Sequence, residues 1–393
     1  MSALGTSFVS ERAMKIPESG VRVMFRIAQR LKDVVNLSLG EPDFETPPYI
    51  VAAAVRAMKE GYTHYTPNAG LIEFREAAAE KLSRENKIHA DPETEIMATV
   101  GSMGALSLAM LTVVNPGEEV LVPSPGFASY EAQVLMAGGR PVSYRLIEEK
   151  EFQPDVEELS RLVTSRTKAI LLNSPSNPTG SVLSERTIKE IAELAVEQNL
   201  IIISDEAYER ILYDDAQHLS VASLPGMKDL TISVFSLSKT YAMTGWRIGY
   251  AVSSREIISE MTKLQEHLAA HPSSISQMAA VAALTGPDDY VETMVKEYAE
   301  RRNLVMRELS RVPGLRCVKP MGAFYVFPNI SDFGVSSRDF AMHLLKEAKV
   351  VVVPGTAFGR FGEGHIRISY SVSEENLLKA LSRIGEALER VST

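Results

Sequence analysis

The chain has 393 residues, too many for one compact core, so two domains are expected. Hydrophobic residues make up 45% and charged residues 23%, and the net charge of -9 without a long basic run argues against nucleic acid as a partner. The lone cysteine, Cys317, excludes an internal disulfide and a cysteine-based zinc site, so no metal is expected. Residues 1–5 do not resemble a signal peptide, and no apolar run approaches the ~20 residues of a membrane span, so a cytoplasmic protein without a membrane partner is expected.

Apolar spacing predicts the elements in chain order. It indicates a helix over 21–31, a short strand over 36–40 and a boundary at Pro42, Pro47 and Pro48. Further helices are expected near 50–60, 71–86, 104–114, 155–162 and 184–198, and strands over 120–122, 169–172, 200–203 and 232–235. Unbroken apolar runs that alternate with helices predict an α/β fold with a mostly parallel sheet, sandwiched by helices.

The pattern changes after about residue 285. A long helix is expected over 288–309, short strands over 324–327, 350–353 and 365–369, and a last helix over 374–391. We predict that residues 1–45 form an N-terminal segment and part of a small domain. Residues 46–285 are expected to form the large domain, and residues 286–393 a smaller α+β domain.

Polar side chains follow three of the predicted strands. In open α/β sheets, ligands bind at the carboxyl ends of the strands. Asn177 lies in the turn after the strand over 169–172, Asp205 and Tyr208 follow the next strand, and Ser236 and Lys239 follow the one after that. Neighbouring strand ends therefore deliver an amide, a carboxylate, a phenol and an amine, which predicts a single polar site.

Each of these groups has a chemical interpretation and a plain structural one. Burial would lower the pKa of Lys239, and a neutral amine forms a Schiff base with an aldehyde, whereas most lysines are solvated. Asp205 would keep a pyridine nitrogen protonated or would cap a turn. Tyr208 and Asn177 would donate to a ring oxygen, or serve as a core tyrosine and a turn residue. Phe127 would stack on an aromatic cofactor or belong to the core.

A second group of residues suits anions. The glycine-rich turn over 101–104 precedes a predicted helix, whose N-terminus favours phosphate, although Ser102 would otherwise be only an N-cap. Ser236 and Arg247 would add a hydroxyl and a guanidinium to the same phosphate. Arg367, between two isoleucines of a late strand, would bind an α-carboxylate or face water on an edge strand.

Ordered motifs along the chain resemble class I and II aminotransferases of fold type I, and closely the subgroup of aromatic and aspartate enzymes of archaea and bacteria. The resemblance runs from about Ser38 to the C-terminal helix. Its markers are 36–43 (NLSLGEPD), 65–70 (YTPNAG), 173–180 (NSPSNPTG), 204–208 (SDEAY), 238–240 (SKT), 243–247 (MTGWR) and 322–325 (GAFY). So many motifs in the family's order make a chance match very unlikely.

The resemblance implies a role for each candidate. Lys239 would hold pyridoxal 5'-phosphate (PLP) and move a proton between the substrate Cα and C4′ of the cofactor. Asp205 would pair with the pyridine nitrogen. The other cofactor contacts would be Asn177 and Tyr208 at the ring oxygen, Phe127 on the ring, and Ser102, Met103, Ser236 and Arg247 at the phosphate. Arg367, with Asn177 and the Gly40 backbone nearby, would hold the substrate carboxylate.

The resemblance also implies a homodimer. Tyr65 would reach the phosphate bound by the neighbouring subunit, so that each site is complete only in the dimer. The segment over 16–22 would lie near the entrance of the site and help to close it.

One position departs from part of the family, because aspartate-using members often carry a lysine where Met103 stands. Without that charge, we expect an aromatic or broad amino donor and a 2-oxo acid acceptor, 2-oxoglutarate, in a ping-pong reaction. Aspartate or alanine aminotransfer stays open, as do a PLP-dependent C–S lyase and a cyclopropane-carboxylate synthase of the same fold. A PLP-binding regulator, a lysine-dependent aldolase and a nucleotide-binding enzyme are disfavoured, because the chain lacks helix-turn-helix, barrel and phosphate-loop patterns.

Overall fold

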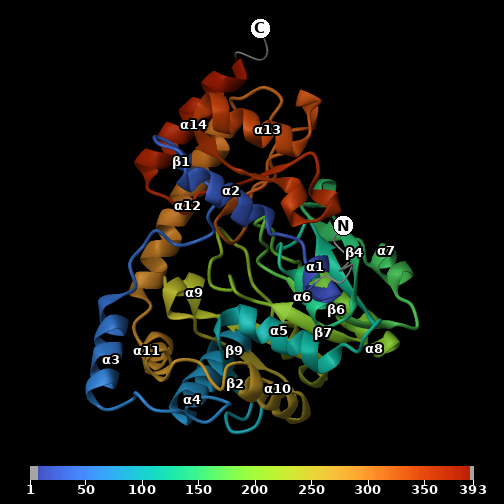
Figure 1. Ribbon diagram of the computed structural model, residues 1–393, viewed down its shortest axis with the longest axis vertical. Coiled ribbons are helices and arrows are strands. Elements are labelled where there is room, and N and C mark those ends of the chain that lie inside the picture. Colours follow the sequence, from blue (N-terminus) through green and yellow to red (C-terminus); the bar gives the residue numbers. More distant parts are fainter. Residues whose placement is uncertain (1–7, 390–393) are drawn as a thin grey trace, which may run out of the picture.

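The computed structural model describes residues 8–389. Its centre is an eight-stranded mixed sheet (Figure 1). In spatial order the strands are β2 (Ile96–Thr99), β9 (Gly249–Val252), β8 (Thr231–Ser236), β7 (Ile201–Asp205), β6 (Thr167–Asn173), β3 (Glu119–Ser124), β4 (Arg140–Ile147) and β5 (Gln153–Pro154). Neighbours from β8 to β4 run parallel, whereas β9 is antiparallel to β8 and β2, and β5 is antiparallel to β4. The predicted mostly parallel sheet is therefore confirmed, and only β9 and β5 run against the direction of the other strands of this sheet.

Helices cover both faces of this sheet. They are α3 (Pro48–Lys59), α4 (Ile72–Lys81), α5 (Gly101–Val113), α6 (Tyr130–Met136), α7 (Val156–Leu162), α8 (Glu185–Gln198), α9 (Leu237–Thr240), α10 (Arg255–Leu268) and α11 (Ser274–Thr285). Leu171 and Ile203 pack in the core with α5 and α10, whereas Ile170 and Ile202 pack on the opposite face with α8. Since both faces are buried, apolar residues follow one another along the central strands, which explains the hydrophobic runs in the sequence.

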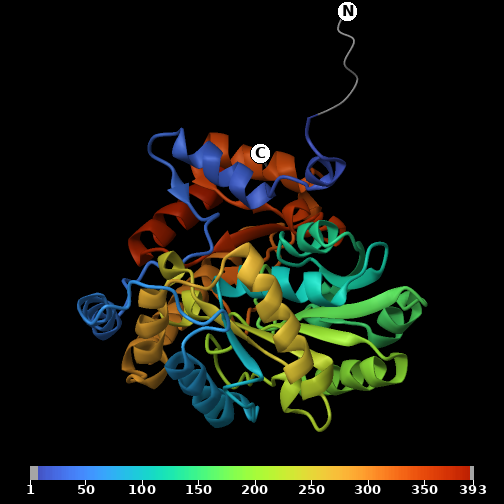
Figure 2. The same cartoon turned by 60° about the horizontal axis from the view of Figure 1, so that its bottom comes forward.

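A second core forms where the N-terminal and C-terminal elements pack together. Its elements are α2 (Gly20–Gln29), β1 (Val35–Asn36), α12 (Asp289–Leu309), β10 (Tyr325–Val326), α13 (Ser337–His343), β11 (Val350–Val351), β12 (Val353–Pro354), β13 (Ile366–Ser369) and α14 (Glu374–Glu389), with the short α1 (Glu11–Lys15) before them. β13 is the middle strand of a three-stranded antiparallel sheet, and β1 pairs with β11. Figure 2 shows the blue α2 beside the orange and red C-terminal elements. The domain boundaries stated above stay a prediction.

The structure corrects several expected elements. Apolar periodicity misses β2, β4, α10 and α11; in β4 several side chains are exposed or half-buried, so it is not an apolar run. The helix expected from residue 104 begins at Gly101, so the glycine-rich segment is its first turn and not a turn before it. α4 ends at Lys81 and continues as a π-helical turn, Leu82–Asn86.

Two expectations concern the ends of the chain and its relation to a membrane. Residues 1–5 and the last residues of the helix expected to reach 391 lie outside the described residues. Within residues 8–389, no helix combines the length and apolarity needed to cross a membrane.

Candidate active site

Backbone register brings the predicted residues to one end of the sheet. The last residue of β6 lies opposite Asp205, the last residue of β7, and Asp205 lies opposite Val234 of β8. Since these three strands are parallel, the segments that follow them leave from the same edge. Asn177, Tyr208 and Lys239 stand in those segments, as the sequence predicts.

The adjoining strands bring the phosphate-binding candidates to this edge. Thr99 of β2 lies opposite Gly249 of β9, which in turn lies opposite Ser236 of β8. Ser102 follows Thr99 within the first turn of α5, and Arg247 precedes Gly249. The three candidates therefore gather around the N-terminus of a 13-residue helix, where backbone N–H groups attract an anion.

Close packing explains the glycines at this corner. Gly101 has φ +64°, and a Cβ there would lie 2.6 Å from Arg247 Nη2. A Cβ on Gly249 would lie 3.0 Å from the backbone nitrogen of Ser102. The Arg247 guanidinium and the N-terminus of α5 thus lie close together only because positions 101 and 249 carry no side chain. Ser102 is not an N-cap, because that position belongs to Val100.

Lys239 lies in α9, directly after β8. Its Nζ donates to the carbonyl oxygen of Gly40 at 2.5 Å and lies 6.0 Å from the ring centre of Phe324. Burial lowers the pKa of Lys239 from 10.5 to about 8, and Glu41 only partly opposes this shift. Near neutral pH a useful fraction of the amine is therefore unprotonated and nucleophilic.

Asp205 is buried, and no cation within residues 8–389 pairs with it. Its Oδ2 accepts from the Tyr130 hydroxyl at 2.8 Å, and its Oδ1 accepts from the backbone N–H of Ala207 at 3.2 Å. Burial raises the pKa of Asp205 from 3.8 to about 6, against the effect of these hydrogen bonds. A cationic group bound beside it would restore the charged carboxylate.

Arg367 is, like Asp205, a buried charged residue, but its charge is positive. It lies in β13, is 2% exposed, and is stacked between the rings of Tyr325 and Phe358, at 4.5 and 4.9 Å from their centres. Nη1 donates to Asn177 Oδ1 at 2.9 Å and Nη2 donates to the carbonyl oxygen of Ser38, whereas Nε finds no hydrogen-bond partner in the described part of the chain. Burial lowers the pKa of Arg367. The interpretation as a solvated edge-strand arginine is therefore wrong, and this buried guanidinium is suited to an anion.

Tyr208 and Asn177 both face this group. The Tyr208 hydroxyl lies 2.7 Å from the Tyr325 hydroxyl, and burial raises the pKa of Tyr208 well above its usual value. The Asn177 backbone N–H donates to Asn173 Oδ1 at 2.9 Å, which fixes the turn that aims its side chain at Arg367. Tyr208 belongs to the second core and Asn177 to a turn, so their contacts with a cofactor stay a prediction.

The remaining candidates are Phe127, Met103 and Tyr65. Phe127 is half-buried with its ring centre 5.5 Å from that of Tyr130, and Met103 Sδ accepts from Gln133 Nε2 at 3.6 Å. Phe127 also borders a cavity of about 440 Å³ whose walls include residues 17–20, part of the segment expected near the entrance. Tyr65 is 90% exposed and contacts His271, apart from the buried group around Asp205.

Sequence reasoning misses two tyrosines of this site. Tyr325 contacts both Tyr208 and Arg367, and its hydroxyl is so close to Gly40 that a Cβ there would lie 2.1 Å away. Tyr130 donates to Asp205. Tyr325 lies in the family motif over 322–325, but no role is predicted for it from the sequence. Nothing local in the sequence marks Tyr130, because its partner Asp205 is 75 residues away.

Comparison with known proteins identifies the family of this chain. Residues 32–384 match the family model "Aminotransferase class I and II". The chain belongs to the class I and II aminotransferases. It is 49% identical over 382 residues to an aspartate aminotransferase of Pyrococcus abyssi, covering 97% of this chain and 98% of that one. It is 45% identical over 383 residues to aromatic-amino-acid aminotransferase 2 of Thermococcus litoralis, with the same coverage.

Solved structures of aminotransferases share the fold. An aromatic aminotransferase from Pyrococcus horikoshii superposes with a TM-score of 0.90 at 47% identity, over 95% of this chain and 99% of that one. An aspartate aminotransferase from Thermus thermophilus, solved with maleate, gives 0.93 at 40% identity, over 98% and 100%. The aminotransferase is thus a PLP-dependent enzyme of fold type I, as the motifs imply.

The residues present fit PLP and an amino acid. The cradle at Gly101 and Arg247 suits a phosphate, and the buried Asp205 lacks the cation that a protonated pyridine nitrogen would supply. The free Nε of Arg367 suits a carboxylate. When bound, PLP supplies the ring that withdraws electrons from the substrate Cα.

Proposed function

We propose that this aminotransferase takes the amino group of an L-amino acid with an aromatic or other apolar side chain and transfers it to 2-oxoglutarate. The observation that carries the proposal is the arrangement of three buried groups. Lys239 supplies an amine with a pKa of about 8. Asp205 is a buried carboxylate that no cation of the described residues balances, and Arg367 is a buried guanidinium that no acidic side chain of those residues balances. An amino acid on PLP would complete all three.

Each residue then has a defined task. Arg367 binds the substrate carboxylate, supported by Asn177 and the backbone at Gly40. Lys239 Nζ holds the cofactor in the resting enzyme and, once free, removes the proton from the substrate Cα and holds it for the next transfer. Asp205 keeps the pyridine nitrogen protonated.

Other side chains position the cofactor. Tyr208 and Asn177 donate to the ring oxygen, and Phe127 stacks on the ring. The phosphate is bound by Ser102 and Met103 through backbone N–H groups and by Ser236 and Arg247 through side chains. Ser236 Oγ already accepts from the Ser238 backbone N–H at 3.2 Å, so its own O–H points elsewhere and remains available to donate.

The preference for an apolar donor rests on Met103. The thioether stands where aspartate-using members carry a cation. The separate cavity beside Phe127 has apolar walls at Val23, Met24 and Phe358 and charged ones at Glu18, Glu131 and Arg338, so it does not decide the donor. Relatives named for aspartate and for aromatic amino acids are about equally similar, so their names do not decide the matter. Rates with phenylalanine, tyrosine, alanine and aspartate test it directly.

A variant sharpens this test. Met103→Lys should raise the rate with aspartate relative to phenylalanine. If aspartate is far ahead of the other donors in the parent enzyme, the donor preference is wrong. If 2-oxoglutarate fails to restore the PLP form, the acceptor is wrong. Release of ammonia in place of amino transfer would favour the lyase alternative.

We further propose that the enzyme works as a homodimer in which Tyr65 binds the phosphate held by the partner. Tyr65 is 90% exposed in the single chain, and Val51, Val55 and Met58 present an exposed apolar row on the neighbouring helix α3. Light scattering on the purified protein should give twice the 43.1 kDa of one chain. The cytoplasmic location stays a prediction.

A further inference from the structure

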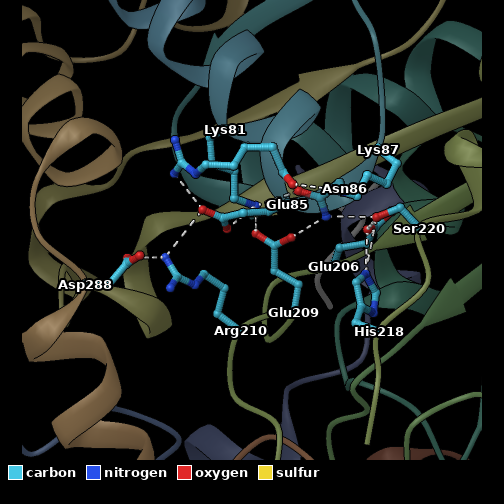
Figure 3. A network of polar contacts seen from close by, with 11 residues as sticks. Lys81, Glu85, Asn86, Lys87, Glu206, Glu209, Arg210, His218, Ser220 and Asp288 are labelled. Atoms are coloured by element: carbon cyan, nitrogen blue, oxygen red, sulfur yellow. Dashed lines mark hydrogen bonds and ion pairs between the residues drawn. The ribbon is translucent and has the colours of Figure 1, made fainter.

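A buried polar network lies behind the loop that follows β7 (Figure 3). Residues 204–210 span the end of β7 and the loop after it, and their side chains point to two different sides. Asp205 and Tyr208 turn toward Tyr130 and Tyr325 of the active site, whereas Glu206 and Glu209 turn into the network. Neither glutamate takes part in the chemistry proposed above, yet both lie next to residues that do.

Lys81 is the central cation of the network. It is the last residue of α4, is 1% exposed, and its ammonium contacts a carboxylate oxygen of Glu209. It also donates to Asn86 Oδ1 at 2.8 Å and lies 4.9 Å from the ring centre of Phe235, the residue before Ser236. Lys81 thus contacts the segments at the ends of both β7 and β8, which carry the active-site residues.

The π-helical turn after α4 extends the network. Asn86 ends this turn, and its Nδ2 donates to Glu209 Oε2 at 2.6 Å and to Ser220 Oγ at 2.9 Å. Ser220 in turn donates to Glu206, whose Oε2 lies 2.7 Å from His218 Nε2. The wider π-helical turn brings Asn86 onto the same face as Lys81. Both glutamates of the loop are therefore held by one connected set of side chains.

The carboxylates and the histidine could suggest a metal site, because ligand atoms of Glu206, Glu209 and His218 all lie within 4.8 Å of one another. However, both carboxylate oxygens of Glu209 already have partners, because the Lys81 ammonium contacts Oε1 and Asn86 Nδ2 donates to Oε2. Glu209 would have to give up one of these contacts to bind a metal. The network is thus best explained as a fixed support.

We propose that Lys81 is a positioning residue for catalysis: through Glu209 and Asn86 it fixes the loop that aims the Asp205 carboxylate and the Tyr208 hydroxyl at the cofactor. The proposal rests on the roles proposed above for Asp205 and Tyr208. If Lys81 is removed, the Glu209 carboxylate, whose side chain is only 10% exposed, loses the cation that it contacts and is drawn toward water. The backbone between Glu206 and Arg210 moves with it.

The test compares Lys81→Met with two further variants. Lys81→Met/Glu209→Gln removes the charge on both partners while the amide can still accept from Asn86. Arg75→Met is the matched control, because Arg75 is a 9% exposed cation of the same helix that binds the carbonyl oxygens of Pro92 and Glu93 instead of the loop.

Three quantities are measured for each variant: kcat and KM for the amino donor, the pH dependence of the visible absorbance of the PLP-loaded enzyme, and hydrogen exchange of residues 204–213 in the PLP-free protein. Lys81→Met should lower kcat by about 10- to 100-fold, leave KM within about threefold, shift the absorbance titration and speed exchange in the loop. The double variant should recover most of these changes, and Arg75→Met should show none of them.

Two results would overturn the proposal. One is a Lys81→Met enzyme with the parent's kcat, titration and loop exchange, and the other is an Arg75→Met enzyme that changes in the same way. If Lys81→Met does not fold, Glu209→Gln replaces it with the same expected directions. An inactive parent enzyme would count against the proposed function alone, because loop exchange in the PLP-free protein still tests the positioning role.

Discussion

Replacement of Arg367 tests whether this residue binds the substrate carboxylate. The buried guanidinium uses Nη1 and Nη2 to hold Asn177 and Ser38, and its Nε has no partner. A carboxylate accepting from Nε and a second N–H gains two charge-assisted hydrogen bonds of ~1.5–3 kcal/mol each. Arg367→Met should therefore lower kcat/KM by roughly 10²- to 10⁴-fold, and Arg367→Lys, which keeps only a point charge, by somewhat less.

The assay needs a ligand that lacks the carboxylate. Inhibition by the amine that corresponds to the best donor should be the same for the parent and for Arg367→Met. In Arg367→Met the free energy of unfolding should change by no more than ~2 kcal/mol. The variant loses two hydrogen bonds, but it also removes a buried positive charge that no acidic side chain of the described residues balances, and the two effects offset each other. If kcat/KM stays within about threefold, or the amine is affected as strongly as the amino acid, the carboxylate does not bind at Arg367.

Three other predictions concern the amine, the carboxylate and the dimer. The rate at which PLP-free enzyme captures PLP should rise about tenfold per pH unit up to pH 8 and then level, because the pKa of Lys239 is lowered to about 8 and only the neutral amine reacts; a flat profile below pH 8 would contradict this. Asp205→Asn should cut kcat by about 10²-fold or more. Because folding raises the pKa of Asp205 from 3.8 to about 6, the parent loses stability as the pH rises through this range. PLP-free Asp205→Asn should therefore have a higher melting temperature than the parent above pH 6, and this difference should vanish below pH 3.8. Equal melting temperatures at all pH values would refute the shift. Inactive Tyr65→Ala and Lys239→Ala chains, mixed and refolded, should regain up to about a quarter of parent activity through hybrid dimers with one intact site, and no recovery would argue against a shared site.

The fold was largely predictable because both faces of the central sheet are buried. That burial gives β3, β6 and β7 short unbroken apolar runs in the sequence, and in β8 only Ser233 interrupts the run over 232–235. β4 was missed because burial is uneven along it, so neither an apolar run nor a clean alternation marks it. The mixed character of the sheet depends on β9 running antiparallel, a direction that apolar spacing does not encode.

The candidate site was predictable where a residue directly follows a strand. Parallel register then brings Asn177, Asp205 and Lys239 to the same edge without further information. Contacts across long separations are different. The bond from Lys239 to Gly40 spans 199 residues, and the clamp of Lys81 on Glu209 spans 128, so only the folded chain reveals them.

The central claim, that Lys239 carries PLP for amino transfer, is tested most directly by one spectroscopic titration. Purified enzyme loaded with PLP should have a visible absorbance band that single L-amino acids abolish and 2-oxoglutarate restores. Borohydride reduction before any amino acid is added should leave the mass of the cofactor on the peptide that contains Lys239, and on no other lysine. A band that no amino acid alters, or cofactor mass on a different lysine, would contradict the account.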